Sequence, residues 1–225
     1  EPKHITWTPS QAEKGGYKHF MLKEIHEQPR AMVDTLRGRI SLETGDVHLE
    51  DMSLDDARVH QIDRIYICAC GTAWHAGLVG KRFIEQWARI PVEVDLASEF
   101  RYRDPLVTAN SLFIAVSQSG ETADTLAALK EARRRGAHVL SICNVMESSI
   151  ARDSDDVVYT HAGPEIGVAS TKAFTAQVTV LTLMAASLAR KKGKLNESKY
   201  RNLLSSLEAI PQKVQLVLDK TDKIK

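Results

Sequence analysis

The chain has 225 residues, of which 43% are hydrophobic, and this is enough for one large α/β domain with flanking segments. The formal net charge is +1 and the charges are spread along the chain, so the composition favours neither nucleic acid nor a membrane as a partner. Cys68, Cys70 and Cys143 lie in or at the ends of apolar stretches without metal-ligand spacing. We therefore expect buried thiols in a reducing cytoplasm and no metal site.

The first 60 residues differ from the rest of the chain. A polar start leads into a helical pattern over residues 17–36, interrupted at Pro29, and then into a loop that carries Gly38 and Gly45. We interpret residues 1–60 as a helical strap and linker that lies outside the core. No signal peptide is evident and the first residue is Glu1, which suggests a piece of a longer protein.

Strands and helices alternate over residues 61–195, which we take as the main domain. The strands are expected at residues 65–69, 92–96, 112–116, 139–143 and 157–159, and the helices at residues 74–89, 98–102, 122–135, 148–152 and 171–191. This order predicts a three-layer α/β/α fold with a mostly parallel sheet, whose ligands bind beyond the carboxyl ends of the strands. The apolar residues 178–189 are interrupted by polar side chains and read as a buried helix. Residues 196–225 form a C-terminal helical segment.

The turn at residues 117–122, Ser-Gln-Ser-Gly-Glu-Thr, joins an apolar strand to a helix. Gly120 allows the backbone to turn, and Thr122 begins a helix whose free N–H groups and dipole favour an anion. The turn holds no Lys or Arg, and it fits neither the Walker loop nor the Gly-x-Gly-x-x-Gly dinucleotide pattern. The pattern therefore predicts a phosphate held by hydroxyls and backbone amides.

Two more turns are expected at the same edge of the sheet, at residues 70–75 and 167–172. Any one of the three could simply cap a helix with a hydroxyl group. Together they favour a sugar phosphate, because the central turn holds the phosphate while Thr72, Gln118 and Ser170 are free to bond sugar hydroxyls or the remaining phosphate oxygens.

Several side chains near these turns carry no clear chemistry. Glu121 would repel a phosphate, so we expect it to point away, towards a basic side chain of a neighbouring segment. Lys172 opposes the helix dipole, so a carboxylate such as Glu165 or an anion should pair with it. His75 is expected to be a packing or surface residue. No Ser-His-Asp or Cys-His arrangement can be assembled, and we assign no catalytic residue to this chain.

At these residues the chain resembles the sugar isomerase (SIS) domain family and, within it, the first SIS lobe of the glucosamine-6-phosphate synthases. The resemblance rests on residues 23–29, 70–72, 97–102, 117–125 and 165–174. It implies a flavodoxin-like five-stranded sheet that binds fructose 6-phosphate or glucosamine 6-phosphate. The matching substrate-binding residues are Thr72, Ala73, Ser117, Gln118, Ser119, Thr122, Val168 and Ser170. The family usually has Ser where this chain has Ala73, which removes one hydrogen bond worth about 0.5–1.5 kcal/mol.

The resemblance also implies partners that lie outside this chain. In similar proteins a glutaminase domain and a second SIS lobe supply ammonia and the catalytic groups, the enzyme is a cytoplasmic homodimer, and no metal or organic cofactor is needed. We therefore expect this chain to bind the sugar phosphate without catalysing the reaction by itself. A non-catalytic SIS sugar-phosphate sensor and a stand-alone sugar-phosphate isomerase or deglycase stay open as alternatives.

Overall fold

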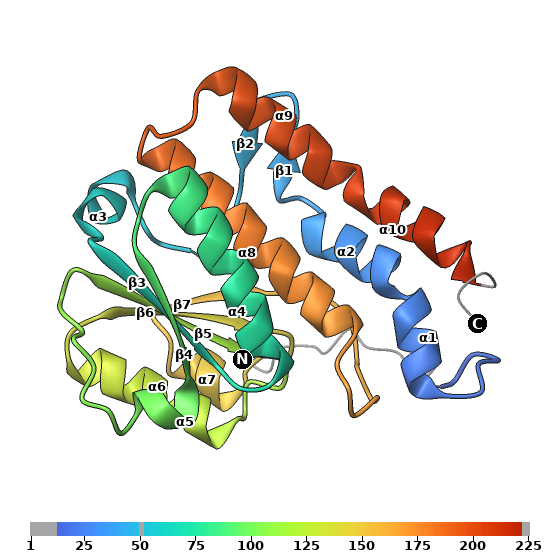
Figure 1. Ribbon diagram of the computed structural model, residues 1–225, viewed down its shortest axis with the longest axis horizontal. Helices are drawn as coiled ribbons and strands as arrows, with labels where there is room; N and C mark the ends of the chain where they lie inside the picture. The colour runs from blue at the N-terminus through green and yellow to red at the C-terminus, as the bar shows by residue number, and fades with distance from the viewer. Residues whose placement is uncertain (1–12, 50–51, 222–225) are drawn as a thin grey trace.

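The computed structural model describes residues 13–49 and 52–221 of the chain. A parallel sheet with the strand order β4-β3-β5-β6-β7 lies at its centre (Figure 1). Its strands are β3 (Arg64–Ala69), β4 (Val92–Leu96), β5 (Ser111–Ser117), β6 (His138–Cys143) and β7 (Asp156–Tyr159). All neighbouring strands run parallel, which confirms the predicted flavodoxin-like sheet of five strands.

The central strands are apolar on both faces because successive side chains point to opposite sides of a sheet that is covered twice. In β3, Ile65 and Ile67 belong to one hydrophobic cluster, while Tyr66 and Cys68 belong to the other. Every residue of β5 is buried. Such strands have no polar side, so they appear in the sequence as continuous apolar runs.

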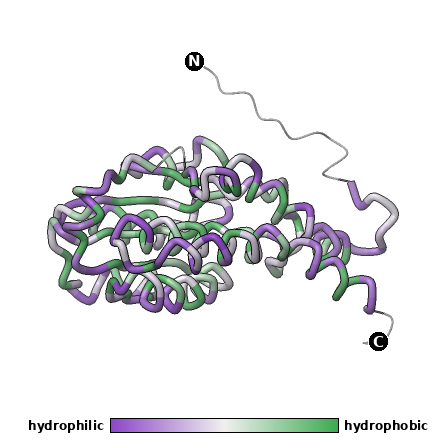
Figure 2. Tube along the Cα trace, turned by 90° about the horizontal axis from the view of Figure 1, so that it is seen from above, coloured by the Kyte–Doolittle hydropathy of each residue, from purple (hydrophilic) through white to green (hydrophobic). Residues whose placement is uncertain are grey.

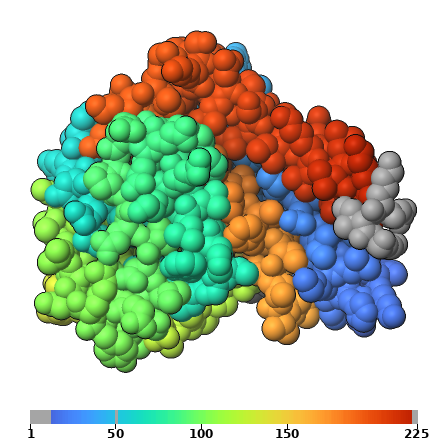
Figure 3. Space-filling model, viewed as in Figure 1, coloured from blue at the N-terminus to red at the C-terminus, as the bar shows by residue number. Residues whose placement is uncertain are grey.

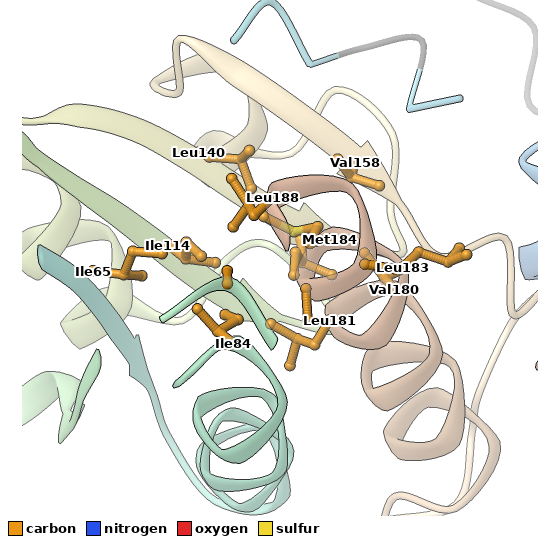
Figure 4. Packing of buried hydrophobic residues seen from close by; sticks show 14 of the residues in the cluster. Ile65, Ile84, Ile114, Leu140, Val158, Val180, Leu181, Leu183, Met184 and Leu188 are labelled. Carbon is orange, nitrogen blue, oxygen red and sulfur yellow. The ribbon is translucent and has the colours of Figure 1, made fainter. Parts of the chain in front are cut away.

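Helices cover both faces of the sheet and give the predicted three layers (Figure 1). One face carries α4 (Thr72–Phe83), its continuation η2 (Ile84–Ala88) and α8 (Lys172–Lys191), and the other carries α5 (Ala97–Phe100), α6 (Ala123–Arg134) and α7 (Ser149–Arg152). Figure 4 shows Leu181 and Met184 of α8 in the core beside Ile65 and Ile114 of the strands. Seen from above, the strands form a largely hydrophobic middle layer (Figure 2).

Helix α8 is the central helix of its face. By length and composition it could cross a membrane, yet 83% of an apolar 18-residue stretch of this helix is buried inside the fold, as expected for a core helix. It approaches α4 closely, since a Cβ on Gly80 would lie 3.1 Å from Leu181. In the space-filling view only a strip of α8 is visible between α4 and the N-terminal helices (Figure 3). The prediction of a buried helix is confirmed.

The N-terminal segment contains α1 (Phe20–His26), α2 (Gln28–Leu36), a hairpin of β1 (Ile40–Ser41) and β2 (Asp46–Val47), and α3 (Asp56–Gln61). Pro29 lies at the start of α2, where its missing N–H costs nothing. The expectation that this segment lies outside the core is wrong, because Leu36, Leu49 and Leu54 belong to the main hydrophobic cluster. These scattered leucines give no periodic signal, and only their contacts with the rest of the fold bury them.

The C-terminal segment folds as two helices, α9 (Glu197–Glu208) and α10 (Ile210–Leu218). The chain reverses after α8, with Gly193 at a positive φ of 63°. The predicted helical segment is divided at Ala209, and Pro211 lies in the first turn of the second helix, where its missing N–H is tolerated. Helix α10 then packs beside α2, so both ends of the described chain lie on the same side (Figure 1).

Candidate functional site

The three predicted turns follow β3, β5 and β7, and the parallel sheet places all of them at its carboxyl edge. The first two are neighbours, because Ala69 at the end of β3 pairs with Val116 of β5. Strand β7 is separated from β5 by β6, so the loop at residues 160–171 starts further along the edge. This edge is the place where open α/β sheets bind their ligands.

The central turn is held in shape by its own hydroxyl groups. The Ser117 Oγ accepts a hydrogen bond from the Gly120 N–H at 3.0 Å and lies 3.2 Å from the Thr122 Oγ1. The Ser119 Oγ accepts from the Glu121 N–H at 3.2 Å. Gly120 has a φ of 66°, a conformation that other residues rarely adopt. Hydrogen bonds within the turn therefore fix its shape, and we call residues 117–122 the cradle.

Thr122 stands at the N-cap of α6 but does not cap it. Its side chain accepts no hydrogen bond from the helix and instead lies next to Ser117. The first backbone bond of α6 runs from the Leu126 N–H to the Thr122 carbonyl, so the N–H groups between them have no partner within the helix. The turn thus differs from an ordinary capped helix start and offers free donors to an anion.

The first turn has a similar, uncapped start. Gly71 occupies the N-cap of α4 with a φ of 59°, and Thr72 is exposed on the first helical turn. The side chain of Ala73 is buried against the core. His75 is exposed and its Nδ1 lies 3.1 Å from the Gly71 carbonyl oxygen, so it is a surface residue bonded to its own helix start.

The third loop, residues 160–171, leads into α8, and this helix is capped by a side chain, unlike α4 and α6. The Glu165 Oε1 accepts from the N–H groups of Thr171 at 2.8 Å and Ala173 at 3.1 Å, so a carboxylate caps this helix. The Nζ of Lys172 donates to the Glu27 Oε2 at 2.7 Å. The expectation that a carboxylate pairs with Lys172 is therefore confirmed, but this carboxylate is Glu27 and not Glu165. The partner comes from the junction of α1 and α2, 145 residues away in the sequence, and only the tertiary fold brings it there.

Glu121 points away from the hydroxyl groups of the turn, as expected. Its Oε1 accepts from the Ser149 N–H at 2.7 Å, at the start of α7. Hydrogen bonds from Ser149 lower the pKa of the Glu121 carboxyl below its ordinary value, and the charge of Arg152 contributes less. The main partner is thus a helix backbone and not the basic side chain that we expected.

The two predicted residues of the third loop differ in burial. Val168 is fully exposed at the tip of the loop. The Ser170 Oγ is buried and has no hydrogen-bond partner among the described residues. A buried hydroxyl without a partner costs about 1–3 kcal/mol, so Ser170 is suited to a ligand or water that would satisfy it.

Sequence reasoning missed Asn144, which follows β6 and is 5% exposed. Its backbone N–H donates to the Gln118 carbonyl at 3.1 Å, and its Nδ2 donates to the Gly163 carbonyl at 2.8 Å. Its Oδ1 accepts from the Thr160 hydroxyl at 2.9 Å and from the Ala162 N–H at 2.8 Å. Asn144 therefore ties the central turn to the third loop. A polar residue directly after a buried strand was the available signal.

The cysteines and the other titratable groups show no metal chemistry in the part of the chain that the structure describes, where no group of three His, Cys, Asp or Glu could hold an ion. Cys68 and Cys143 are buried, while Cys70 is only half-buried, with its Sγ 3.9 Å from the Thr125 Oγ1. Burial raises the pKa of the Cys143 thiol to about 11. The prediction of buried thiols is thus confirmed for two of the three.

Comparisons with known proteins identify the fold and its family. The SIS domain matches residues 59–187, more than half of the chain. The chain is 54% identical, over 98% of its length, to a glutamine–fructose-6-phosphate aminotransferase (isomerizing) of Caldanaerobacter subterraneus subsp. tengcongensis. It is 58% identical, over 92% of its length, to the protein of that name from Symbiobacterium thermophilum. It spans about a third of these relatives, 36% and 34% of their lengths.

A solved structure agrees with these matches. The C-terminal domain of glucosamine-fructose-6-phosphate aminotransferase from Francisella tularensis is 41% identical, with a TM-score of 0.82 over 89% of this chain and 55% of that one. The common fold and the extent of the domain match lead to one conclusion. The chain belongs to the SIS domain family.

Proposed function

We propose that this chain is the sugar-phosphate-binding lobe of a glutamine:fructose-6-phosphate aminotransferase (isomerizing), an enzyme that makes glucosamine 6-phosphate and glutamate from fructose 6-phosphate and glutamine. The names of the relatives at 54% and 58% identity support the reaction. A glutaminase domain and a second SIS lobe would complete the enzyme, which would work as a cytoplasmic homodimer. The observation that carries the proposal is the uncapped start of α6 beside two facing hydroxyl groups.

The phosphate would lie in the central turn. Ser117, Gln118, Ser119 and Thr122 surround the helix start, and the unpaired N–H groups of the first turn of α6 would donate to the phosphate oxygens. The hydroxyl of Thr122 can rotate from its neighbour to the ligand without a change of backbone. The helix dipole would supply the positive potential that Lys or Arg supplies in nucleotide sites.

The sugar would extend from this cradle towards the first and third turns. Thr72 is exposed on the helix start next to the cradle, and the backbone N–H of Ala73 lies in the same first turn of α4. Across the edge, the unpaired hydroxyl of Ser170 would bond the sugar or a phosphate oxygen, and Val168 would contact it through its backbone or side chain. These assignments divide the ligand into a phosphate part and a sugar part, which experiments can separate.

Isothermal titration calorimetry of the purified chain with fructose 6-phosphate and with glucosamine 6-phosphate tests the proposal. We expect binding by the wild type and its loss in the double variant Ser119→Ala/Thr122→Ala, with the circular dichroism spectrum unchanged. The matched control is Thr108→Ala/Ser111→Ala, which removes a hydroxyl pair 3.3 Å apart at the opposite end of the same strand. Equal affinity in the cradle variant and the wild type would place the phosphate elsewhere.

A further inference from the structure

A carboxylate from the N-terminal helix α1 holds the third loop. Glu24 is 2% exposed, and its Oε1 accepts from the N–H groups of Ile166 at 2.6 Å and Gly167 at 3.1 Å. Its Oε2 also accepts from the Gly167 N–H at 3.1 Å. These residues are more than 140 positions apart in the sequence. Figure 3 shows the loop beside α1 at the lower edge of the molecule.

The fit between Glu24 and the loop leaves no room for a side chain at position 167. A Cβ added to Gly167 would lie 2.5 Å from the Glu24 Oε2 and 3.4 Å from the Met21 Cα. The φ of Gly167 is not in the left-handed region, so the backbone itself would accept Ala. Glycine is needed here because of the close approach of α1 and not because of its conformational freedom.

The same helix is fixed to the start of α8 by buried charges. Lys172 is 4% exposed and binds Glu27, and Lys23, 8% exposed, lies 3.5 Å from the other carboxylate oxygen of Glu27. Two buried lysines thus lie next to the carboxylate of Glu27, which directly follows α1. Partners of this kind make a buried charge tolerable, and removing one of them is costly.

The hydrogen-bonding groups that a ligand would use follow directly after Gly167, the last residue that Glu24 holds. The backbone N–H groups of Val168, Ala169 and Ser170 make no hydrogen bond within residues 13–49 and 52–221, and the Ser170 Oγ is buried and unpaired. Glu24 occupies the two preceding N–H groups and so sets the direction in which the chain enters this stretch. In contrast, the hydrogen bonds of the central turn come from the turn itself and from the segments after β6, none of them from described strap residues.

We infer that Glu24 is a positioning residue for sugar recognition: it holds the third loop so that Ser170 and the free amides meet the sugar part of the ligand, while the phosphate cradle forms independently. The inference rests on the proposed function. It makes the N-terminal strap a part of the binding site, and it predicts that a change in the strap alters affinity for the sugar phosphate and not for phosphate alone.

Titrations of the purified chain with fructose 6-phosphate and with inorganic phosphate test this role. Glu24→Ala should weaken fructose 6-phosphate binding about tenfold, the loss expected from one or two hydrogen bonds, and leave inorganic phosphate binding within about twofold. Glu24→Gln keeps one carbonyl oxygen as acceptor and should restore most of the affinity. Asp34→Asn is the matched control, because among residues 13–49 and 52–221 the ion-pair partners of Asp34 in α2 are Arg30 and Arg37 of the same helix region.

A double-mutant cycle with Gly167 separates positioning from general destabilisation. Gly167→Ala should weaken fructose 6-phosphate binding in the wild type, but it should add little in the Glu24→Ala background, where the clashing carboxylate is gone. If Glu24→Ala does not fold, Gly167→Ala carries the test, because it disturbs the same contact and should weaken binding of fructose 6-phosphate but not of inorganic phosphate.

Two outcomes would overturn the positioning role. One is an equal loss of affinity for both ligands in Glu24→Ala, and the other is an effect of Gly167→Ala that is the same in both backgrounds. A wild type that binds fructose 6-phosphate, together with unchanged Glu24 variants, would refute this inference alone. A wild type that binds neither ligand would refute the proposed function as well.

Discussion

Gly120 is the residue of the central turn that we expect to tolerate substitution least. Its φ is 66°, and a Cβ at this position would lie 1.9 Å from the Ser148 Oγ and 2.5 Å from the Ser148 Cβ. Its N–H and its carbonyl both form hydrogen bonds, with Ser117 and with the Ile150 N–H. The turn therefore cannot shift to make room without breaking contacts on two sides.

The cost of Gly120→Ala follows from two separate effects. A residue with a Cβ in the left-handed region costs about 1–2 kcal/mol. Overpacking against Ser148 adds about 1–3 kcal/mol. Gly136 provides a matched control, because its φ is 92° but the nearest atoms to an added Cβ, both of Ala109, lie at 3.8 Å. Gly136→Ala should thus show the backbone effect without the clash.

Urea unfolding at neutral pH measures both variants. Gly120→Ala should lower the free energy of unfolding by about 1–3 kcal/mol more than Gly136→Ala does, which is the overpacking contribution. The variant Ser148→Gly removes both clashing atoms and should recover most of this difference in the double variant with Gly120→Ala. Equal destabilisation by the two Gly→Ala variants, or no recovery, would refute the reasoning from the Cβ clash.

Further predictions concern Asn144, Glu131 of α6 and the thiol of Cys143. Asn144→Asp loses the donor to the Gly163 carbonyl and should lower the free energy of unfolding by about 1–3 kcal/mol in urea melts. Hydrogen bonds from Arg134 and Arg135 lower the pKa of Glu131 to about 2, so its stabilising effect is full above its ordinary pKa of 4.5 and is lost as the pH falls through about 2. The difference in unfolding free energy between wild type and Glu131→Gln should therefore shrink from pH 6 to about pH 2. Because burial raises the pKa of Cys143 to about 11, iodoacetamide at pH 8 should leave it unmodified in the folded protein, as mass spectrometry of peptides would show.

Each of these predictions has a result that contradicts it. For Asn144 it is a loss no larger than that of Asn202→Asp on the exposed side of α9. For Glu131 it is a difference between the two proteins that stays constant across the pH range. For the thiols it is modification of Cys143 at the rate found in urea-unfolded protein.

Local patterns were sufficient for much of the fold. Apolar or β-branched stretches at regular spacing located the five strands of the sheet, and their alternation with helices predicted the parallel sheet and the edge where the turns meet. The strand pattern and its alternation with helices are both local signals, because each strand and the helix after it are formed by consecutive residues. The hairpin near Gly45 was missed because its strands pair over only two residues each, too few to show alternation.

The position of the central turn could also be predicted from the sequence, but the hydrogen bonding of its hydroxyl groups could not. The sequence allowed Thr122 either to cap α6 or to face a ligand, since both uses need the same residue type. In the structure Thr122 does not cap α6, because its hydroxyl lies beside Ser117 and the helix start stays uncapped. The sequence likewise could not tell that Glu165 caps α8 while Lys172 takes another partner.

By itself the sequence determined the α/β architecture, the position of the three turns and the hydroxyl-rich, cation-free character of the central one. Only the tertiary structure decided which residues hold these turns together. Asn144 joins the central turn to the third loop, and Glu24 and Glu27 of the strap bind residues some 140 positions away. The physical reason is that a turn's conformation depends on hydrogen bonds and charges from segments that are distant in the chain, and such contacts leave no periodic pattern in the sequence.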